Sequence, residues 1–296
     1  MDKEIATFNN TKDILNQYNI RLNKNLGQHF IVDNNILEQI IKAANLKGDE
    51  NVIEIGSGIG SLTQFILREL DNGVVYGIEK DKRFIKILKD LFQKKANLEI
   101  INKDILQINW ENFINNYNLK EKEIKIIANL PYYITTPIIE SLLFSPLQIN
   151  EMVFMMQREV AKRLAASPGN KDYGSLSVFI QFHYKVEIQF EVPPKSFIPR
   201  PEVYSSVIKL TPHEETPYQV NNKEFFFKVV RAIFNLRRKN IKNGLTLSPH
   251  IKLEKAIILE GLKKSNIDKR IRGENLSIEK MVELSNNFWD LKQEKE

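Results

Sequence analysis

Residues 51–63 read NVIEIGSGIGSLT, an apolar run that ends in closely spaced glycines and continues into a helical pattern. The run has the length and β-branched content of a buried strand. Glycines at positions 56 and 58 have no side chain, so a ligand can touch the backbone where that strand ends. Open α/β sheets bind their ligands at this edge. The segment therefore predicts an α/β sheet with a ligand site beside Gly56 and Gly58.

The glycine spacing narrows the kind of ligand. A dinucleotide fingerprint would place a third glycine at position 61, where this chain has Ser61. The GxGxG spacing favours a nucleoside lying across the loop over a pyrophosphate at the helix terminus. A tight turn that binds nothing also fits this segment taken alone.

Short β-rich runs alternate with helical patterns over residues 51–190. Parallel strands need a crossover of a dozen or more residues, so this alternation predicts a mostly parallel sheet flanked by helices. The expected strands are 51–55, 73–79, 98–104, 125–130 and 151–157, with helices at 61–70, 82–92, 135–144 and 158–166 and a polar helix after the third strand.

The end of the sheet and the domain boundary follow from the next segments. Residues 176–185 and 186–193 both look like strands and predict an antiparallel hairpin at the sheet's end. The stretch 192–203, VPPKSFIPRPEV, holds four prolines and predicts an extended surface segment. Everything from about Asn222 onward has a helical pattern. We therefore predict two domains, a sheet domain over residues 1–210 and a helical domain over residues 211–296.

Composition excludes several classes of function. The chain has no cysteine, and its four histidines are scattered, so neither disulfides nor a metal centre is expected. No apolar run approaches the ~20 residues of a membrane span, and the first ten residues contain no apolar signal core. We expect a cytoplasmic protein with no membrane contact.

The net charge of +6 is confined to the last third of the chain. Residues 209–296 carry 18 Lys and Arg against 12 Asp and Glu, whereas the first 208 residues carry 25 of each. A basic module joined to a neutral one indicates an anionic partner such as a nucleic acid, although a solvated basic face gives the same count.

Two acids end the next two strands of the predicted sheet. Glu79, at the tip of GVVYGIE, can accept hydrogen bonds from both hydroxyls of a ribose. Asp104, in NKDIL, can accept one from an exocyclic amine, while Ile105 offers an apolar edge to a purine. Either acid alone also fits an ordinary strand end or helix cap. Together with the glycine turn, they predict an adenine nucleoside cofactor.

The fourth strand ends in NLPYYITT, residues 129–136, whose composition suits an amine. An adenine amino group is a poor nucleophile because its lone pair is delocalised into the ring. The Asn129 side-chain oxygen and the Leu130 carbonyl can accept its two N–H groups and favour a pyramidal nitrogen. Pro131 holds Leu130 extended and lacks a competing N–H, and Tyr132 offers a face for an extruded base. We call Asn129 to Tyr132 the amine grip. A proline-terminated strand with a packed aromatic is the plainer alternative.

The amine grip suits a reaction in which the bound amine accepts a methyl group from a sulfonium donor. Such a donor is already electrophilic, so alignment supplies most of the acceleration and no general base is required. The nitrogen becomes cationic on attack and loses its proton afterwards.

At this point the chain resembles a known family, the ribosomal RNA adenine N6-dimethyltransferases, and most closely its bacterial members that act on small-subunit RNA. The resemblance covers nearly the whole chain. It is carried by the segments NLGQHFIVD (25–33), IEIGSGIGSLT (53–63), GIEKD (77–81), NKDIL (102–106), NLPYYITTPII (129–139), MMQREVAKRL (155–164), YGSLSV (173–178), VPPKSFIPRPEVYSSVI (192–208) and RAIFNLRRKNIKNGL (231–245).

The resemblance implies a Rossmann-like S-adenosylmethionine-dependent methyltransferase sheet, mostly parallel with one antiparallel strand, and a small all-α C-terminal domain. It implies S-adenosylmethionine as donor and the dimethylation of two adjacent adenines in the 3′-terminal hairpin loop of small-subunit RNA during late ribosome assembly. The implied partner is the small ribosomal subunit, and we expect a monomer.

The resemblance also assigns residues by position. Phe197, in KSFIP, matches a second aromatic that sandwiches the target base against Tyr132, and it would otherwise be an oddly exposed ring. Residues 23–33 match a lid over the cofactor. The family often has asparagine at the positions of His29 and Tyr133, which leaves polar contacts there open. The implied cofactor contacts are His29, Ile31, Gly56, Glu79, Asp104 and Asn129.

The segment 225–245, FFFKVVRAIFNLRRKNIKNGL, predicts a helical face that binds RNA phosphates. Its apolar positions are Phe227, Val230, Phe234 and Ile241. Its cationic positions are Lys228, Arg231, Arg238 and Lys242. A solvated helix face is the plainer reading of the same pattern.

Two other functions share these features. An enzyme that methylates large-subunit RNA and confers macrolide resistance would use the same arrangement of site residues. An assembly or transcription factor with secondary catalytic activity would keep the fold. The intact amine grip favours an enzyme, and segments 192–203 and 237–245 resemble the small-subunit enzymes more.

Overall fold

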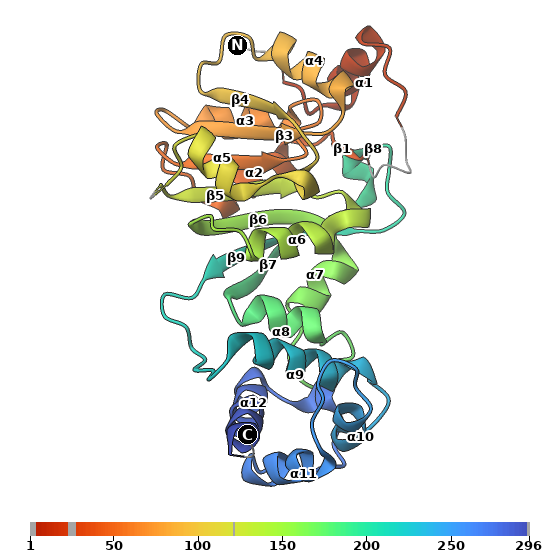
Figure 1. Cartoon of the computed structure of the whole chain (residues 1–296). Coiled ribbons are helices and arrows are strands. Elements are labelled where there is room, and N and C mark those ends of the chain that lie inside the picture. The colour runs from red at the N-terminus through yellow and green to blue at the C-terminus, as the bar shows by residue number, and fades with distance from the viewer. Residues whose placement is uncertain (1–3, 23–27, 121, 295–296) are drawn as a thin grey trace. The chain divides into compact units, whose positions relative to one another are not determined.

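The computed structural model describes residues 4–22, 28–120 and 122–294 (Figure 1). The predicted lid at residues 23–33 therefore lies partly outside the described residues, which resume at Gln28. None of the helices within the described ranges has the length and apolar character needed to cross a membrane.

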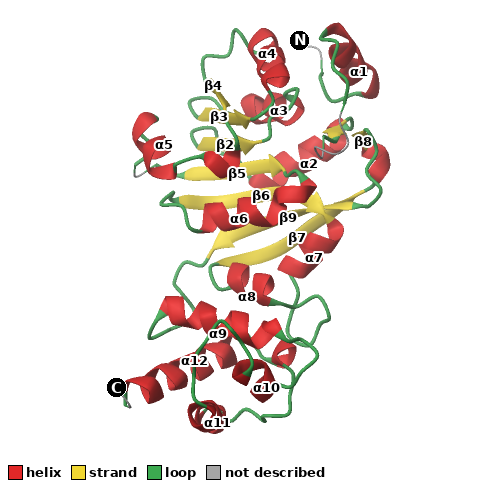
Figure 2. Ribbon diagram, turned by 45° about the vertical axis from the view of Figure 1, so that its right-hand side comes forward, coloured by secondary structure: helices red, strands yellow, loops and turns green. Residues whose placement is uncertain are grey.

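The centre of the fold is a seven-stranded sheet in the order β4-β3-β2-β5-β6-β9-β7, with helices on both of its faces (Figure 2). Neighbouring strands from β4 to β6 run parallel, and β9 pairs antiparallel with β6. The predicted mostly parallel α/β sheet is confirmed. The strands are β2 Asn51–Ile55, β3 Val74–Glu79, β4 Leu98–Asn102, β5 Ile124–Asn129, β6 Ile149–Gln157, β7 Tyr184–Val192 and β9 Ser205–Pro212.

A second, two-stranded sheet joins distant parts of the chain. Strand β1 (Phe30–Ile31) pairs antiparallel with β8 (Phe197–Ile198), so that Ile31 lies opposite Phe197. Both strands are largely buried, and Phe197 belongs to the same apolar cluster as Phe30 and Ile31. The prediction that residues 192–203 form only an extended surface segment is therefore wrong at its centre.

The helices around the sheet mostly begin at side-chain caps. Asp33 caps α2 and Asp81 caps α4 by accepting hydrogen bonds from backbone N–H groups two residues on. The helices from the N-terminus to the end of β6 are α1 Phe8–Gln17, α2 Asn34–Ala44, α3 Ser61–Glu69, α4 Lys82–Leu91, α5 Trp110–Asn116 and α6 Thr135–Leu143, with 3₁₀ turns η2 Ile105–Gln107 and η3 Tyr132–Ile134.

The predicted strand at 176–185 is wrong, because residues Ser175–Gln181 form helix α8. The Ser177 hydroxyl accepts from the Gly174 N–H and donates to the Arg163 carbonyl, which fixes the start of the helix. Residues 177–180 are all buried, and such a short apolar run suits a buried helix as well as a strand. The predicted hairpin is therefore absent, and the sheet neighbour of β7 is β9.

By packing, the chain divides into two compact units. The first comprises residues 1–161 and 187–212, and the second comprises residues 162–186 and 213–296. The second unit thus includes α8, which contacts α9 (Lys223–Asn235). The division of the chain into two independent domains between residues 210 and 211 stays a prediction.

The second unit is helical, as expected, but its basic segment is broken. Residues 225–245 do not form one continuous helix, because α9 ends at Asn235 and Asn240 caps a new helix by accepting from the Asn243 N–H. The predicted apolar face is buried on both sides of this break. The other helices of this unit are α10 Ile241–Thr246, α11 Lys255–Lys264 and α12 Ile278–Gln293, with the 3₁₀ turn η5 Gly273–Asn275. The residues of α7 Arg158–Leu164 fall in both units, and the 3₁₀ turn η4 Pro194–Ser196 lies in the first.

Candidate active site

Strand register brings the predicted residues to one edge of the sheet. Ile55, the last residue of β2, pairs with Ile78 on one side and Ala128 on the other. Glu79 pairs with Asn102 at the end of β4. The glycine turn, Glu79, Asp104 and Asn129 therefore follow the carboxyl ends of four adjacent strands, at the place where the strand order reverses and ligands bind.

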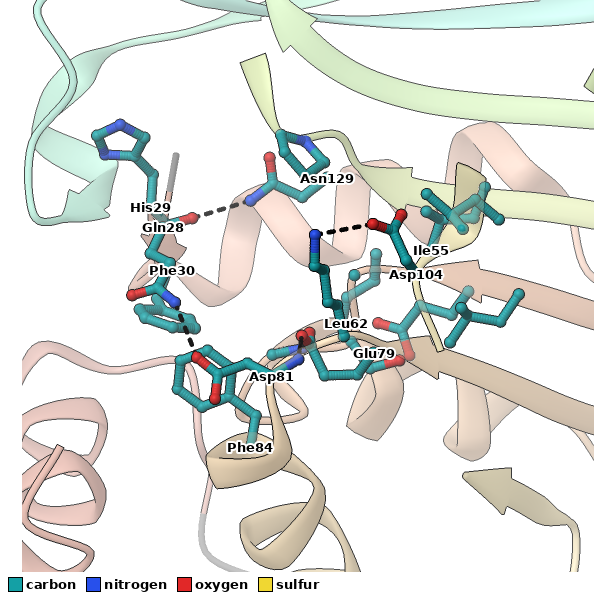
Figure 3. A pocket seen from close by; sticks show the side chains of 18 of the residues that line it. Gln28, His29, Phe30, Ile55, Leu62, Glu79, Asp81, Phe84, Asp104 and Asn129 are labelled. Carbon is teal, nitrogen blue, oxygen red and sulfur yellow. Dashed lines mark hydrogen bonds and ion pairs between the residues drawn. The ribbon is translucent and has the colours of Figure 1, made fainter. Parts of the chain in front are cut away.

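A cavity of about 500 Å³ opens at this edge (Figure 3). Its volume lies in the range of small-molecule sites. Eight predicted cofactor residues line it together, and Pro131 of the amine grip joins them. The eight are His29, Ile31, Gly56, Gly58, Glu79, Asp104, Ile105 and Asn129.

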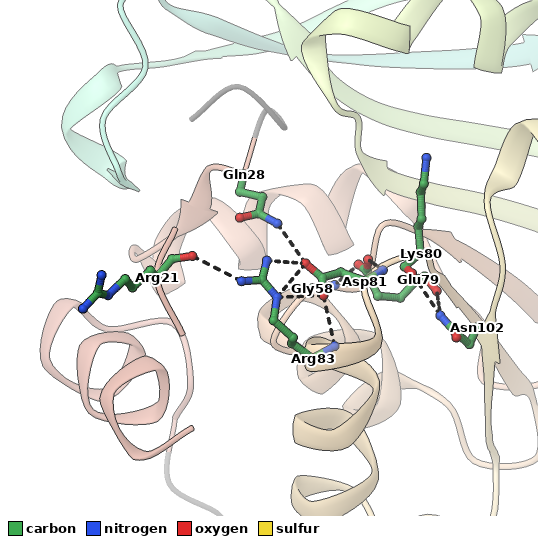
Figure 4. A network of polar contacts seen from close by, with 8 residues as sticks. All are labelled: Arg21, Gln28, Gly58, Glu79, Lys80, Asp81, Arg83 and Asn102. Atoms are coloured by element: carbon green, nitrogen blue, oxygen red, sulfur yellow. Dashed lines mark hydrogen bonds and ion pairs between the residues drawn. The ribbon is translucent and has the colours of Figure 1, made fainter. Parts of the chain in front are cut away.

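The glycine turn is held against the carboxylate of Glu79 (Figure 4). Glu79 accepts from the Gly58 N–H at 2.9 Å and from the Asp81 N–H at 2.7 Å. Burial raises the pKa of Glu79, while these two backbone donors oppose that rise. Each carboxylate oxygen keeps a lone pair beyond its backbone bond, so Glu79 can still accept from a ribose.

The backbone of the turn requires glycine. Gly56 and Gly58 have φ angles of +77° and +53°, in the left-handed region. A Cβ at position 58 would lie 2.8 Å from the Phe30 ring, which packs over the turn from β1. Position 58 therefore serves the shape of the loop as well as ligand access.

Sequence reasoning missed Glu54, a buried carboxylate beneath the turn. Its side chain is 1% exposed, lines the cavity and accepts a 2.5 Å hydrogen bond from the Thr63 hydroxyl. Burial raises the pKa of Glu54 to about 7; the hydrogen bond from Thr63 opposes this rise, and the nearby charge of Glu79 adds to it. The only sequence signal was an acid inside an otherwise apolar strand.

Replacing Glu54 with glutamine is expected to flatten the dependence of stability on pH. The folded protein holds this proton more tightly than the unfolded chain, whose carboxyl has a pKa of 4.5. The free energy of unfolding therefore falls as pH rises from about 4.5 to about 7, by up to about 3 kcal/mol from this group. Glutamine keeps an acceptor for Thr63 and carries no charge.

Urea denaturation followed by circular dichroism between pH 5 and 8 measures this difference. Above pH 7, Glu54→Gln should be as stable as the parent or more so. Glu38→Gln is the matched control, because Glu38 is an exposed residue of α2. Parallel profiles for Glu54→Gln and the parent would contradict the assignment.

Asp104 lies at the cavity wall, where its carboxylate accepts hydrogen bonds from Lys80 and Leu106. Its Oδ2 accepts from the Lys80 ammonium at 2.8 Å and its Oδ1 from the Leu106 N–H at 3.1 Å. The hydrogen bond from Lys80 lowers the pKa of Asp104, so the carboxylate stays ionised. Ile105 beside it is buried and lines the cavity.

The amide of Asn129 is oriented by the amino-terminal segment. Its Nδ2 donates to the His29 carbonyl at 2.9 Å, which leaves its Oδ1 as an acceptor. On the other side of the cavity, Gln28 donates to Asp81 at 3.2 Å. Residues 28 and 29 therefore bridge the opening between β3 and β5 (Figure 3). The resemblance implied a lid in this part of the chain, but no local pattern predicted these two contacts.

The other residues of the amine grip are held by contacts with distant parts of the chain, and their predicted roles stay predictions. The Tyr132 ring stacks on the His29 ring at 5.4 Å, and its hydroxyl bonds with the Ser205 hydroxyl at 2.6 Å. Leu130 is buried and donates its N–H to the Met155 carbonyl.

Phe197 is only 1% exposed, so the expectation of an exposed ring is wrong. Pairing of β8 with β1 draws it into the core opposite Ile31. Its role as a second wall for the target base stays a prediction.

The predicted RNA-binding residues lie in the second unit. Lys228 and Arg231 are exposed on α9, and Lys228 pairs with Glu224 at 2.6 Å. Arg238 is exposed between the two helices, and Lys242 is half-buried on α10. The neighbouring Arg237 instead donates to the carbonyls of Lys171 and Tyr173.

Across residues 4–22, 28–120 and 122–294, no cluster of three or more His, Cys, Asp or Glu side chains could hold a metal ion.

Known proteins resemble this chain over nearly its whole length. The chain is 51% identical to the ribosomal RNA small subunit methyltransferase A of Halothermothrix orenii, over 98% of this chain and 95% of that protein. It is 43% identical to the protein of the same name from Alkaliphilus metalliredigens, over 96% of this chain and 98% of that protein.

Solved structures share the fold. A dimethyladenosine transferase from Plasmodium falciparum matches with a TM-score of 0.72 and 26% identity, over 86% of this chain and 95% of that one. The 23S rRNA methyltransferase ErmE matches with a TM-score of 0.66 and 22% identity, over 88% of this chain and 99% of that one, which shows a shared fold. The family model described as ribosomal RNA adenine dimethylase matches residues 19–288. The chain therefore belongs to the ribosomal RNA adenine dimethylase family.

Proposed function

We propose that this protein transfers methyl groups from S-adenosylmethionine to N6 of two adjacent adenines, two on each, in the 3′-terminal hairpin loop of small-subunit ribosomal RNA. We place this reaction late in assembly of the small subunit, in the cytoplasm, with the protein acting as a monomer. The observation that carries the proposal is the orientation of Asn129, whose amide nitrogen donates to the His29 carbonyl and which lines the same cavity as the glycine turn. The small-subunit target is supported by the names of the relatives.

The residues of the cavity fit the cofactor. S-adenosylmethionine, when bound, supplies an electrophilic methyl group on a sulfonium. Glu79 would accept from the ribose hydroxyls, and Asp104 from the adenine amine. The Ser61 hydroxyl is buried at the cavity wall and has no hydrogen-bond partner among the described residues, so a polar group of the cofactor can pair with it.

Asn129 and Leu130 would hold the target amine. The Asn129 oxygen and the Leu130 carbonyl accept its two N–H groups and favour the pyramidal nitrogen formed during attack. The His29 carbonyl fixes the amide so that the oxygen, and not the nitrogen, is presented. Because this arrangement exists before the base arrives, little reorganisation is needed during the reaction.

The second unit would supply affinity for RNA. Lys228, Arg231, Arg238 and Lys242 can neutralise phosphates, which gives binding that weakens steeply with salt and carries no sequence information. Selection of the adenines would then come from the unpaired loop, whose bases are extruded at lower cost.

The test is methylation of unmethylated small subunits with labelled donor, followed by mapping with reverse-transcription stops. Stops at two adjacent adenines in the 3′-terminal hairpin are expected. Stops in large-subunit RNA would assign the resistance-type reaction instead. No methylation of either RNA, together with binding to small subunits, would favour an assembly factor.

Lys80 is expected to compete weakly with the cofactor for Asp104. Its ammonium holds the oxygen that would accept from the adenine amine, but the pair is exposed, and exposed pairs are worth little. Lys80→Met should bind S-adenosylhomocysteine about two- to fivefold more tightly at low salt, with the gain lost at high salt. Isothermal titration calorimetry measures this, with Lys86→Met on α4 as control. Weaker binding by Lys80→Met would show that its side chain instead supports the adenine.

A further inference from the structure

We propose that Tyr204 and Arg158 form a stacking platform for an unpaired RNA base that flanks the target adenine. The inference rests on the proposed function, since it assigns a second contact to the same RNA. Neither residue lines the cavity, and neither belongs to the amine grip.

The pair is exposed and yet held in place. The Tyr204 residue is 43% exposed, and the guanidinium carbon of Arg158 lies 5.0 Å from the centre of its ring. Arg158 donates its backbone N–H to the Tyr204 carbonyl at 3.0 Å and its Nη1 to Glu191 at 3.2 Å. A flat ring and a flat guanidinium are thus presented together at little further entropic cost, which suits a planar ligand.

The platform lies at the same edge of the sheet as the amine grip. Tyr204 precedes Ser205, whose hydroxyl bonds with that of Tyr132. Ser205 pairs with Gln157, the residue before Arg158, while Asn129 pairs with Met155 on the same strand. Strands β5, β6 and β9 are consecutive in the sheet, so two strand spacings, about 10 Å, separate the backbone at Asn129 from that at Val207. Tyr204 lies three residues before Val207, about another 10 Å along the strand direction, so roughly 14 Å separates its backbone from that of Asn129. That separation suits a near neighbour of the target base along the same strand.

The chemistry of the pair favours a base over a phosphate. Arg158 is already paired with Glu191, so its charge is offset in the free protein. What the pair offers is aromatic and guanidinium surface, on which any base can stack. Extrusion of the target adenine also leaves its neighbours without a stacking partner, and a platform beside the grip would restore one.

The first test separates RNA binding from chemistry. Stacking on one aromatic ring is worth about ten- to a hundredfold in affinity. Tyr204→Ala should raise KM for unmethylated small subunits about tenfold and leave kcat within about twofold, as expected for loss of uniform binding. Tyr204→Phe keeps the ring and should stay near the parent. Phe8→Ala, which removes an exposed aromatic of α1, is the control.

Two readouts keep the outcomes distinct. Affinity for S-adenosylhomocysteine and the melting temperature should be unchanged in Tyr204→Ala, which excludes damage to the cavity or the fold. Unchanged KM in Tyr204→Ala, while the parent methylates small subunits, would overturn the platform and leave the proposed function standing. Failure of the parent to methylate would instead overturn the proposed function.

A cross-link identifies the partner directly. With p-benzoylphenylalanine at position 204, irradiation on unmethylated subunits should join the protein to ribosomal RNA within a few nucleotides of the methylated adenines. Cross-links to a ribosomal protein, or to RNA far from those adenines, would overturn the proposal.

Discussion

Asn129→Ala is expected to slow methyl transfer by about 100- to 1,000-fold in a single turnover. The variant loses the oxygen that would accept from the target amine, an interaction that strengthens as the nitrogen becomes pyramidal. Removing one such preorganised group from other enzymes costs a factor of this size. Rapid-quench assays with saturating donor and unmethylated small subunits measure the rate.

A second variant separates the two hydrogen-bonding roles of this amide. Asn129→Asp keeps an acceptor but cannot donate to the His29 carbonyl, so it tests whether that bond orients the side chain. We expect Asn129→Asp to be slower than the parent and faster than Asn129→Ala. Asn115→Ala, at an exposed position on α5, is the control. A single-turnover rate for Asn129→Ala within about fivefold of the parent would refute the amine grip.

Glu79→Ala is expected to weaken binding of S-adenosylhomocysteine by about 100-fold or more. The carboxylate would make two charge-assisted hydrogen bonds to the ribose, each worth about 1.5–3 kcal/mol. Its loss also leaves the N–H groups of Gly58 and Asp81 without their acceptor, which loosens the glycine turn. Calorimetry gives the affinity, and the melting temperature reports on damage to the fold.

Glutamine at position 79 refines this expectation. Glu79→Gln keeps one acceptor oxygen and should bind with intermediate affinity. Because burial raises the pKa of Glu79, the parent should lose affinity as pH falls, beginning at a higher pH than an exposed glutamate would. Glu79→Gln should lack that loss. Equal affinity of parent and Glu79→Ala would show that the ribose lies elsewhere.

Much of the sheet and the cofactor cavity could be predicted because both depend on local patterns. Parallel strands must be separated by crossover segments, so the alternation over residues 51–166 was enough to order the elements. The carboxyl ends of parallel strands share one edge, so a glycine turn and two strand-end acids were enough to place a site. Glu54 was not predicted as a site residue, because its carboxyl becomes distinctive only when burial beneath the turn raises its pKa.

The errors in the helix and strand assignments have a common cause. Residues 177–180 are apolar throughout, and such a run has no period that separates a buried strand from a buried helix. In the basic segment, the apolar positions continue across residues 236–240, but α9 ends at Asn235 and Asn240 caps the start of a new helix. Periodicity describes which residues are buried and does not by itself locate the ends of elements.

The sequence alone therefore determined the class of sheet, the cofactor edge and the residue types of the amine grip, because these follow from spacing along one strand or turn. Only the tertiary structure decided which groups face the ligand. Asn129 is oriented by His29, Tyr132 is held by Ser205, and Phe197 is buried opposite Ile31. Each of these partners lies at least 73 residues away along the chain, so no local pattern encodes the contact. The orientation of a side chain is set by packing between distant segments, and that packing exists only in the folded molecule.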